Sequence, residues 1–199
     1  MHLSDTLSVP MAPGLTPDIL RRIMPEARRR ADRYAEPLRQ AMARYAIITP
    51  ARVAGFLANV AHESGQLAYT SEIASGAAYE GRASLGNTHP GDGKRYKGRG
   101  LIQITGRANY ARASVCLVGN PTLLLECPEM LETTVLAAES AAWFWFDAGL
   151  NEIMDQNDFI GACAVINTGR RQVPTGRING FADRLSFYSR ARAALVKEA

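Results

Sequence analysis

Three glutamates lie close together in the middle of the chain, and their types and spacing are the first feature that could do chemistry. Glu63 ends the segment FLANVAHE, Glu72 follows nine positions later in YTSEI, and Glu80 lies eight positions beyond Glu72. Two carboxyl groups across a cleft can cleave a glycosidic bond: a protonated one donates to the leaving oxygen, and an ionised one activates water. The spacing alone leaves a second interpretation open, in which these are ordinary surface carboxylates.

Other kinds of catalytic centre are poorly supported by the residues present. The run HESGQ, residues 62–66, fails as a zinc-binding HExxH motif because Gln66 stands where the second histidine is needed. The chain has three histidines, and none is paired with cysteines at ligand spacing, so we predict no metal and no cofactor. His62 is then expected to make a structural hydrogen bond near the cleft. A cysteine–histidine nucleophile pair stays open, although the apolar contexts of the cysteines favour inert thiols.

Length and composition limit the architecture and the class of partner. With 199 residues, 47% of them hydrophobic, the chain is expected to form one catalytic domain over residues 1–199, with residues 1–15 as a loose lead-in. No run of about 18 apolar residues exists, so we expect no stable association with a membrane. A formal charge of +4 suits an anionic partner such as nucleic acid, a membrane surface or an acidic cell-wall polymer.

The N-terminus and the cysteines bear on the cellular compartment. The first residues, MHLSDTLSVPMAPG, lack a charged region followed by an apolar one, so we expect synthesis in the cytoplasm without a signal peptide. The three cysteines, Cys116, Cys127 and Cys163, are an odd number without a CxxC motif. We therefore predict reduced, mostly buried thiols rather than disulfides.

The elements that must position the carboxylates are read as helices. Proline after threonine, at 16–17 and again at 49–50, marks two helix starts. Pro25 and Pro37 interrupt the intervening pattern, which predicts short helices from about 17, 26 and 37. Apolar residues at helical spacing predict a helix over 50–63 that ends before Gly65. His62 and Glu63 then lie on its last turn.

The rest of the chain adds helices and one irregular stretch. Residues 76–106 are rich in glycine and are predicted to be a functional loop, in which LIQIT (101–105) forms a strand or an extended segment lining a groove. Residues 133–148 are apolar nearly all round and predict a buried helix with Trp143 and Trp145 in the core. Further helices are expected over 157–166 and 177–197. The predicted fold class is mainly α, with little or no sheet.

Three segments together resemble the family 19 glycoside hydrolases, a group that includes plant and bacterial chitinases and many phage endolysins. The segments are FLANVAHESG, YTSEI and KRYKGRGLIQITGRANY, and the resemblance extends from about Pro50 to Tyr188. The run YEGRASLGNTHPGDG is most similar to the endolysin-type members. The resemblance implies a lysozyme-like fold with two lobes around a central cleft, and an inverting, single-displacement mechanism.

The resemblance also implies roles for particular residues. Glu63 matches the general acid, Glu72 the general base, and Thr105 a residue that helps to hold the attacking water. Glu80 is the alternative base, or a partner of Arg82 or Arg99. The positions that match substrate-binding or cleft residues are Gln103, Asn109, Asn167 and Arg184.

Several further residues have two open interpretations. Tyr79 and Tyr96 could stack on sugar faces, and Tyr96 is included with the substrate-binding set, or they could pack the smaller lobe. Lys97 and Arg99 could meet carboxylates of peptidoglycan or be solvated. The chain departs from the family pattern at Gln66, where a second glycine is frequent, and at Thr168, which replaces a glycine.

The resulting functional prediction is a glycosidase that hydrolyses β-1,4 links in a polymer containing N-acetylglucosamine (GlcNAc). Peptidoglycan is the first substrate expected, and chitin is the alternative. An endolysin of this kind would be a monomer, would bind no nucleic acid, and would reach the cell wall or periplasm after release that depends on a holin. A non-catalytic module that binds the cell wall is the alternative from another class.

Overall fold

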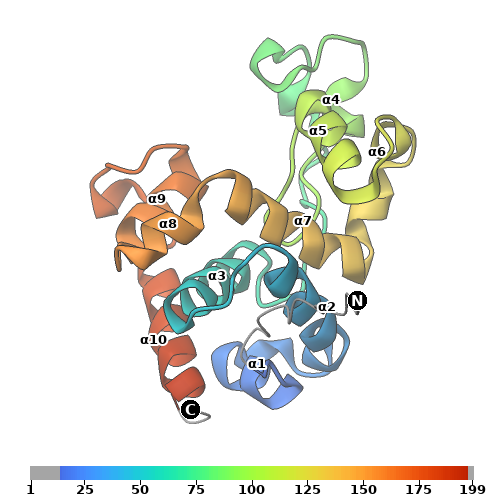
Figure 1. Ribbon diagram of the computed structural model, residues 1–199. Helices are drawn as coiled ribbons and strands as arrows, with labels where there is room; N and C mark the ends of the chain where they lie inside the picture. The colour runs from blue at the N-terminus through green and yellow to red at the C-terminus, as the bar shows by residue number, and fades with distance from the viewer. Residues whose placement is uncertain (1–13, 197–199) are drawn as a thin grey trace, which may run out of the picture.

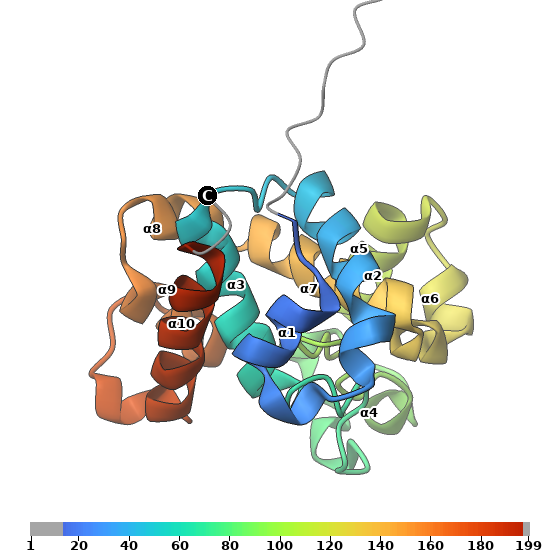
Figure 2. The same cartoon turned by 90° about the horizontal axis from the view of Figure 1, so that it is seen from below.

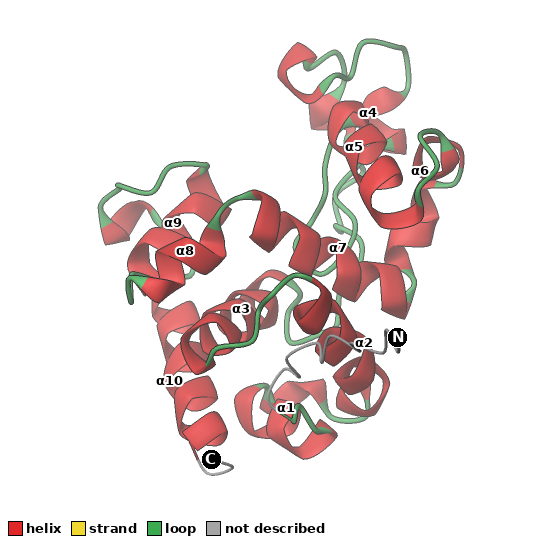
Figure 3. Cartoon of the chain, viewed as in Figure 1, coloured by secondary structure: helices red, strands yellow, loops and turns green. Residues whose placement is uncertain are grey.

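The computed structural model describes residues 14–196, so most of the predicted lead-in lies outside the described residues. Within that range the chain folds into helices joined by loops and turns, and no strand is present (Figure 3). The mainly α prediction is confirmed. The alternative of a strand over 101–105 is wrong, because residues 101–103 form a turn and the segment makes one isolated bridge, between Ile104 and Arg99.

The helices fall into two groups, which are set apart in Figure 1. The group that we call the large lobe contains α1 (Pro17–Ile23), α2 (Arg30–Arg44), α3 (Pro50–Glu63), α7 (Thr134–Asp147), α8 (Leu150–Asp155), α9 (Phe159–Thr168) and α10 (Phe181–Val196). The small lobe contains α4 (Asp92–Arg95), α5 (Arg107–Val118) and α6 (Leu123–Glu126), together with the loops over 70–106. Short 3-10 turns complete the chain: η1 (Pro25–Ala27), η2 (Ala77–Tyr79), η3 (Ala83–Leu85), η4 (Pro128–Glu132) and η5 (Thr175–Arg177).

The helix starts read from the sequence are present. Thr16 and Thr49 each accept a hydrogen bond from the backbone N–H three residues later, at 3.2 and 3.3 Å, and a proline follows each of them at the first helical position. The helix predicted over 50–63 is α3, with the same bounds. The start predicted at Pro37 is wrong, because α2 runs through this proline. Arg33, whose carbonyl loses its helical donor there, is exposed, so water can replace that donor.

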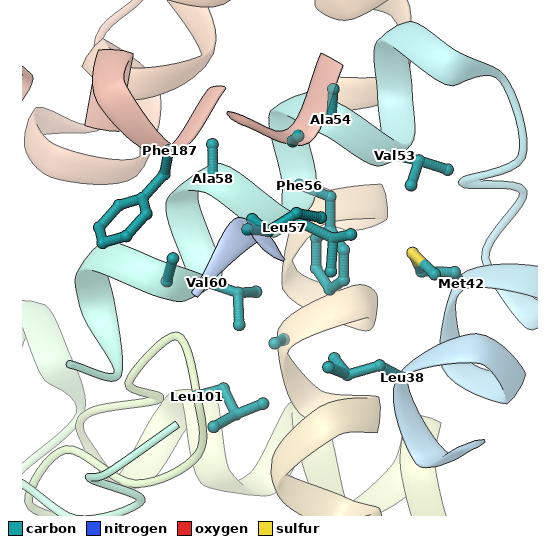
Figure 4. Close-up of a cluster of buried hydrophobic side chains, with 14 of the residues drawn as sticks. Leu38, Met42, Val53, Ala54, Phe56, Leu57, Ala58, Val60, Leu101 and Phe187 are labelled. Atoms are coloured by element: carbon teal, nitrogen blue, oxygen red, sulfur yellow. The ribbon is translucent and has the colours of Figure 1, made fainter. Parts of the chain in front are cut away.

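α3 lies at the centre of the large lobe, with α10 and α1 beside it and α7 behind (Figure 2). Nine consecutive residues of α3, from 53 to 61, are buried. Figure 4 shows Leu57 of α3 near Leu38 of α2, and Phe187 of α10 on the opposite side of α3. The ring of Phe56 meets Trp145 of α7 edge-on, with centroids 5.6 Å apart. A helix buried on all sides is fixed in position, and its last turn can therefore hold a side chain precisely placed at the edge of the core.

α7 joins the two lobes because its side chains enter both hydrophobic cores. Trp145 is fully buried in the core of the large lobe, and Trp143 is 6% exposed in the core of the small lobe. The prediction that both tryptophans are core residues is confirmed. The helix predicted over 177–197 begins later than expected, as α10 at Phe181. None of the described helices is both long and apolar enough to cross a bilayer.

The small lobe has few buried apolar side chains, and a buried ion pair helps to hold it. The Asp92 carboxylate is 2% exposed and accepts two hydrogen bonds from the Arg107 guanidinium, at 2.6 and 2.8 Å. The backbone N–H of His89 donates a third, at 3.0 Å. Arg107 holds the pKa of Asp92 at about 2, below its ordinary 3.8. The pair fastens the start of α4 to the start of α5.

This pair predicts a pH dependence of stability. Since the folded-state pKa of Asp92 is lowered, its contribution is complete above about pH 4 and is lost as pH falls towards 2; its size at neutral pH is about 2 kcal/mol. Asp92→Asn should therefore lower the free energy of unfolding by about this amount at pH 7 and flatten its pH dependence below pH 4. Urea unfolding at several pH values measures both effects.

The matched control for Asp92→Asn is Asp147→Asn. Asp147 pairs with Arg112, and both side chains are substantially exposed, at 40% and 56%. An exposed pair contributes between 0 and about 1 kcal/mol, so this variant should unfold almost as the parent does. Equal effects of the two substitutions would show that burial does not strengthen the Asp92 pair.

Candidate active site

A cavity of about 320 Å³ lies where the end of α3 meets the small lobe. Three residues predicted from the sequence, Glu63, Glu72 and Gln103, are brought together in its wall. Tyr79, whose role the sequence left open, also lines the cavity, together with four residues for which the sequence predicted no role. The complete lining is Glu63, Tyr69, Ser71, Glu72, Ile73, Ala74, Tyr79 and Gln103.

The two carboxylates share this cavity because the chain reverses sharply after α3. Gly65, Gln66 and Leu67 all have left-handed backbones, with φ of 55°, 58° and 67°. The left-handed glycine was expected, but the two residues after it were not, and such a backbone costs a side-chain-bearing residue about 1–2 kcal/mol. Hydrogen bonds hold the turn: the N–H of Gln66 donates to Ala61 O at 2.7 Å, and that of Leu67 to Ser64 Oγ at 2.8 Å.

Gln66 departs from the family pattern, and the structure gives a physical reason why glutamine is tolerated. Its side-chain Oε1 accepts a hydrogen bond of 2.9 Å from the backbone N–H of Glu26 in η1. The Arg30 guanidinium also reaches the Gln66 carbonyl, at 3.5 Å. A glycine would adopt the left-handed backbone more easily but could not make the first contact. The turn after α3 is thus tied to the N-terminal helices.

Glu63 is held by Arg184, which arrives from α10. The Arg184 guanidinium is 1% exposed and forms an ion pair with Glu63 Oε1. It also donates to Asn59 Oδ1 at 2.6 Å and to the Asn179 carbonyl at 3.2 Å. A buried guanidinium must be paired and hydrogen-bonded, and these three acceptors provide that. Arg184, which matches a cleft residue in the sequence, thus contacts one of the two candidate carboxylates, Glu63.

Asn59 is a site residue that the sequence interpretation missed, and a signal for it exists. It is fully buried and is the only strongly polar residue in the buried run of α3 from 53 to 61. It also lies four residues before Glu63, on the same face of the helix. A lone buried amide one turn before a candidate catalytic carboxylate indicates a partner that has to come from elsewhere in the fold.

Asn167 and His62 do not line the cavity, and their side chains contact α10 and the loop before it. Asn167 Oδ1 accepts a hydrogen bond of 3.0 Å from the backbone N–H of Asn179, in the loop that leads into α10. His62 Nδ1 lies 2.8 Å from Asp183 Oδ2, which is also on α10. Both contacts fix the part of α10 that carries Arg184. The structural role expected for His62 agrees with this position.

Glu72 has a different environment from Glu63. Its Oε2 accepts hydrogen bonds from the Tyr79 hydroxyl and from the backbone N–H of Gly98, both at 3.1 Å. Its backbone carbonyl accepts from Lys97 Nζ at 3.0 Å. Its Oε1 is buried and has no hydrogen-bond partner among the described residues. One carboxylate is therefore paired with a cation, and the other is held by neutral donors with one oxygen left available.

The structure gives Glu80 a structural position. Its two carboxylate oxygens accept hydrogen bonds from the backbone N–H groups of Gly91 and Gly93, at 2.6 and 2.8 Å. It does not pair with Arg82 or Arg99, as the sequence had suggested it could, and it is absent from the cavity lining given above. Because both oxygens are occupied in this way, Glu80 closes the loop between η2 and α4. This position favours Glu72 over Glu80 as the candidate base.

Tyr96 is a correction to the predicted substrate-binding set. Its ring is 1% exposed in the core of the small lobe, 5.2 Å from the ring of Tyr110, with the Arg107 guanidinium 4.8 Å from its centroid. A ring so enclosed has no free face for a sugar. Thr105 and Asn109 are half-buried, and Asn109 Nδ2 donates to the Thr105 carbonyl at 2.8 Å. Both lie outside the cavity lining, and their predicted roles stay predictions.

Arg99 is buried and Lys97 is half-buried, and each makes hydrogen bonds within the chain. Arg99 is 9% exposed and donates to Glu132 Oε1 at 2.7 Å and to the Tyr110 hydroxyl at 3.0 Å. Lys97 donates to the Glu72 carbonyl, as described above. The burial of Arg99 contradicts both interpretations of that residue, whereas the two interpretations of Lys97 stay open.

The cysteines are poor candidates for a nucleophile. Burial raises the pKa of the Cys163 thiol to about 11, so it stays protonated and inert near neutrality. No disulfide links the three cysteines, but Cys116 is exposed and Cys127 partly so, which corrects the expectation of mostly buried thiols. Within residues 14–196, no group of three histidine, cysteine or acidic side chains is arranged to hold a metal ion.

Comparison with known proteins now places the chain. Residues 48–182 match the family model described as chitinase class I, the family 19 glycoside hydrolases. An endochitinase of Arabidopsis thaliana is 35% identical over 139 residues, which is 66% of this chain and 46% of that protein. A family 19 domain-containing protein of Haemophilus influenzae is 30% identical over 127 residues, or 64% of this chain and 54% of that protein. The chain thus spans about half the length of these relatives.

A solved structure shows the same fold over nearly the whole chain. Chitinase C of Streptomyces griseus superposes with a TM-score of 0.73, at 23% identity, and the match covers 93% of this chain and 94% of that structure. The prediction of a mainly α, lysozyme-like fold is therefore confirmed.

The position of Glu80 generates a prediction about the loop. In Glu80→Gln an amide NH₂ replaces one of the two acceptor oxygens, so Gly91 or Gly93 must lose its hydrogen bond. We expect the free energy of unfolding to fall by about 1 kcal/mol. We also expect faster amide hydrogen exchange at these two glycines, which NMR can measure residue by residue.

Glu129→Gln is the matched control, because Glu129 is exposed and the described residues supply no partner for its carboxylate. It should leave both the stability and the exchange at Gly91 and Gly93 unchanged. Unchanged exchange in Glu80→Gln itself would contradict the structural role given to Glu80.

Proposed function

The chain belongs to glycoside hydrolase family 19, the class I chitinase family, and from this premise we propose that it hydrolyses β-1,4 links in polysaccharides that contain GlcNAc. The observation that carries the proposal is the pairing of Glu63 and Glu72 in one cavity. The relatives in both comparisons include proteins named as chitinases. They support cleavage of a chitin-like polymer as the common activity.

The reaction follows from the two carboxyl environments. Glu72 takes a proton from a water molecule as the water oxygen attacks the anomeric carbon, and Glu63 gives its proton to the glycosidic oxygen that leaves. One C–O bond forms, one breaks, and the configuration at the anomeric carbon is inverted. Glu63 becomes an anion in this step, and the Arg184 guanidinium is already placed to stabilise that charge.

The identity of the polymer is the finer part of the proposal. The names of the relatives favour chitin, whereas the net charge of +4 and the endolysin-like run YEGRASLGNTHPGDG favour peptidoglycan. Both polymers have β-1,4-linked amino-sugar backbones, so one pair of carboxyl groups could serve either. Peptidoglycan additionally carries anionic groups that a basic protein would attract.

If peptidoglycan is the substrate, the proposal includes a route to it. We expect a monomer that is made in the cytoplasm, binds no nucleic acid and acts on the cell wall after release through a holin.

Glu63→Gln tests whether the chain is an enzyme of this kind. Glutamine can still accept a hydrogen bond from Arg184 but has no acidic proton, so the fold should persist while kcat falls by about 10²- to 10⁴-fold. Release of reducing ends from a GlcNAc hexasaccharide measures the loss, and NMR of the first product should show the inverted, α anomer.

Two comparisons make this result specific. Glu72→Gln should abolish turnover, and Glu80→Gln should retain a substantial part of it; the reverse order would make Glu80 the base. A non-catalytic module that binds the wall would bind polymer equally well with and without Glu63→Gln and would release no reducing ends from the parent protein.

The choice of polymer has its own test. We expect GlcNAc oligomers to be cut, and if peptidoglycan is also a substrate, cells with a permeabilised outer membrane should lose turbidity. Mass spectrometry of the released muropeptides would then show cleavage in the glycan strand and intact peptide links. Cleavage of chitin oligomers without any lysis would exclude the peptidoglycan proposal.

A further inference from the structure

Tyr79 is the side chain that connects the loop of the small lobe to Glu72. We propose that Tyr79 is a positioning residue, which holds the Glu72 carboxylate by Oε2 so that Oε1 faces the attacking water. This inference rests on the proposed function, because it assumes that Glu72 is the base. This role differs from both interpretations that the sequence left open for Tyr79, which were stacking on a sugar and packing of the small lobe.

The contacts of Glu72 carry the first step. Its Oε2 accepts from Tyr79 and from the Gly98 N–H, both at 3.1 Å, whereas Oε1 is buried without a partner among the described residues. A buried carboxylate oxygen without a donor is costly, so it requires a polar partner from outside the chain. The cavity of about 320 Å³ that Glu72 lines has room for water and for part of a sugar.

The second donor to Glu72 Oε2 is the backbone N–H of Gly98, and there is little free space around this residue. A Cβ at position 98 would lie 2.8 Å from Glu72 Oε2 and 2.5 Å from Gln103 Oε1, so any side chain here would displace these two groups from their present positions. The backbone N–H is fixed by the chain itself. A single donor to Oε2 leaves the Glu72 carboxylate free to rotate about its Cγ–Cδ bond. The Tyr79 hydroxyl is the second donor to Oε2, and the two donors together fix that rotation.

Tyr79 is itself held in place, as a positioning residue must be. Its carbonyl accepts a hydrogen bond from Asn87 Nδ2 at 2.9 Å, and the next residue, Glu80, clamps the loop to the N–H groups of Gly91 and Gly93. The Arg82 guanidinium lies 5.8 Å from the centre of the Tyr79 ring. The carboxylate of Glu80 therefore contributes to the site indirectly, through the position of Tyr79.

The charge state of Tyr79 suits this role. Burial raises the pKa of its hydroxyl, and the hydrogen bond to Glu72 and the charge of that carboxylate raise it further, so the phenol stays neutral and donates. The other charged or titratable groups facing Glu72 are Lys97, on its backbone carbonyl, Tyr110 behind the loop, and Glu63 in the same cavity.

Tyr79→Phe removes the hydroxyl and keeps the ring, so it separates positioning from stacking on a sugar. We expect kcat on a GlcNAc hexasaccharide to fall about tenfold, the typical loss for one hydrogen bond to a charged group, with KM unchanged. Tyr188→Phe, which removes a hydroxyl from a ring stacked on Phe159 in the large lobe, should change neither quantity.

The outcomes distinguish this inference from the proposed function. Glu80→Gln provides a second variant and should lower kcat in the same direction but by less, at unchanged KM. A value of kcat in Tyr79→Phe within twofold of the parent, or a change in KM alone, overturns the positioning role. Absence of turnover in the parent protein would instead overturn the proposed function. Equal urea midpoints for parent and Tyr79→Phe would establish that a loss of kcat is not a loss of fold.

Discussion

Burial of the Arg184 guanidinium beside Glu63 is the constraint on which the rest of the site depends. A cation that is 1% exposed is stable only with several acceptors, and they come from separate parts of the chain: Glu63 and Asn59 on α3, and the carbonyl of Asn179 before α10. Satisfying them requires α10 to pack along α3. The C-terminal helix is therefore part of the candidate site, although Glu63 lies more than a hundred residues before Arg184.

The small lobe uses carboxylates in two different ways. Asp92 and Glu80 have both oxygens occupied by donors of the chain itself, and these contacts shape the loop. Glu72 has one oxygen occupied and one without a partner among the described residues. Satisfied carboxylates contribute to stability, whereas the buried Oε1 of Glu72 can still accept a hydrogen bond from a substrate or a water molecule. The number of carboxylate oxygens that have a donor therefore separates the role of Glu72 from those of Asp92 and Glu80, which the sequence alone does not distinguish.

The sequence could predict what depends on local signals. The bounds of α3 followed from a threonine–proline start and a glycine stop, and the motif around Glu63 and Glu72 indicated the family. What failed depended on distant contacts: the enclosure of Tyr96, the burial of Arg99 against Glu132, and the two structural bonds of Glu80. Local spacing cannot show which oxygen of a carboxylate finds a donor, because the donors lie on the far side of a loop.

The turn after α3 shows that the site also depends on residues outside the family motif. Successive left-handed residues return the chain so that Glu72 shares a cavity with Glu63, and such strain persists only where the surroundings over-determine it. Part of that restraint is the hydrogen bond from the Glu26 N–H to Gln66, and Glu26 lies well before residue 48, where the family match begins. A second glycine would relax the turn but remove this link. The N-terminal helices thus support the turn after α3, and removing them should loosen the spacing of Glu63 and Glu72 even though they contribute no side chain to the cavity.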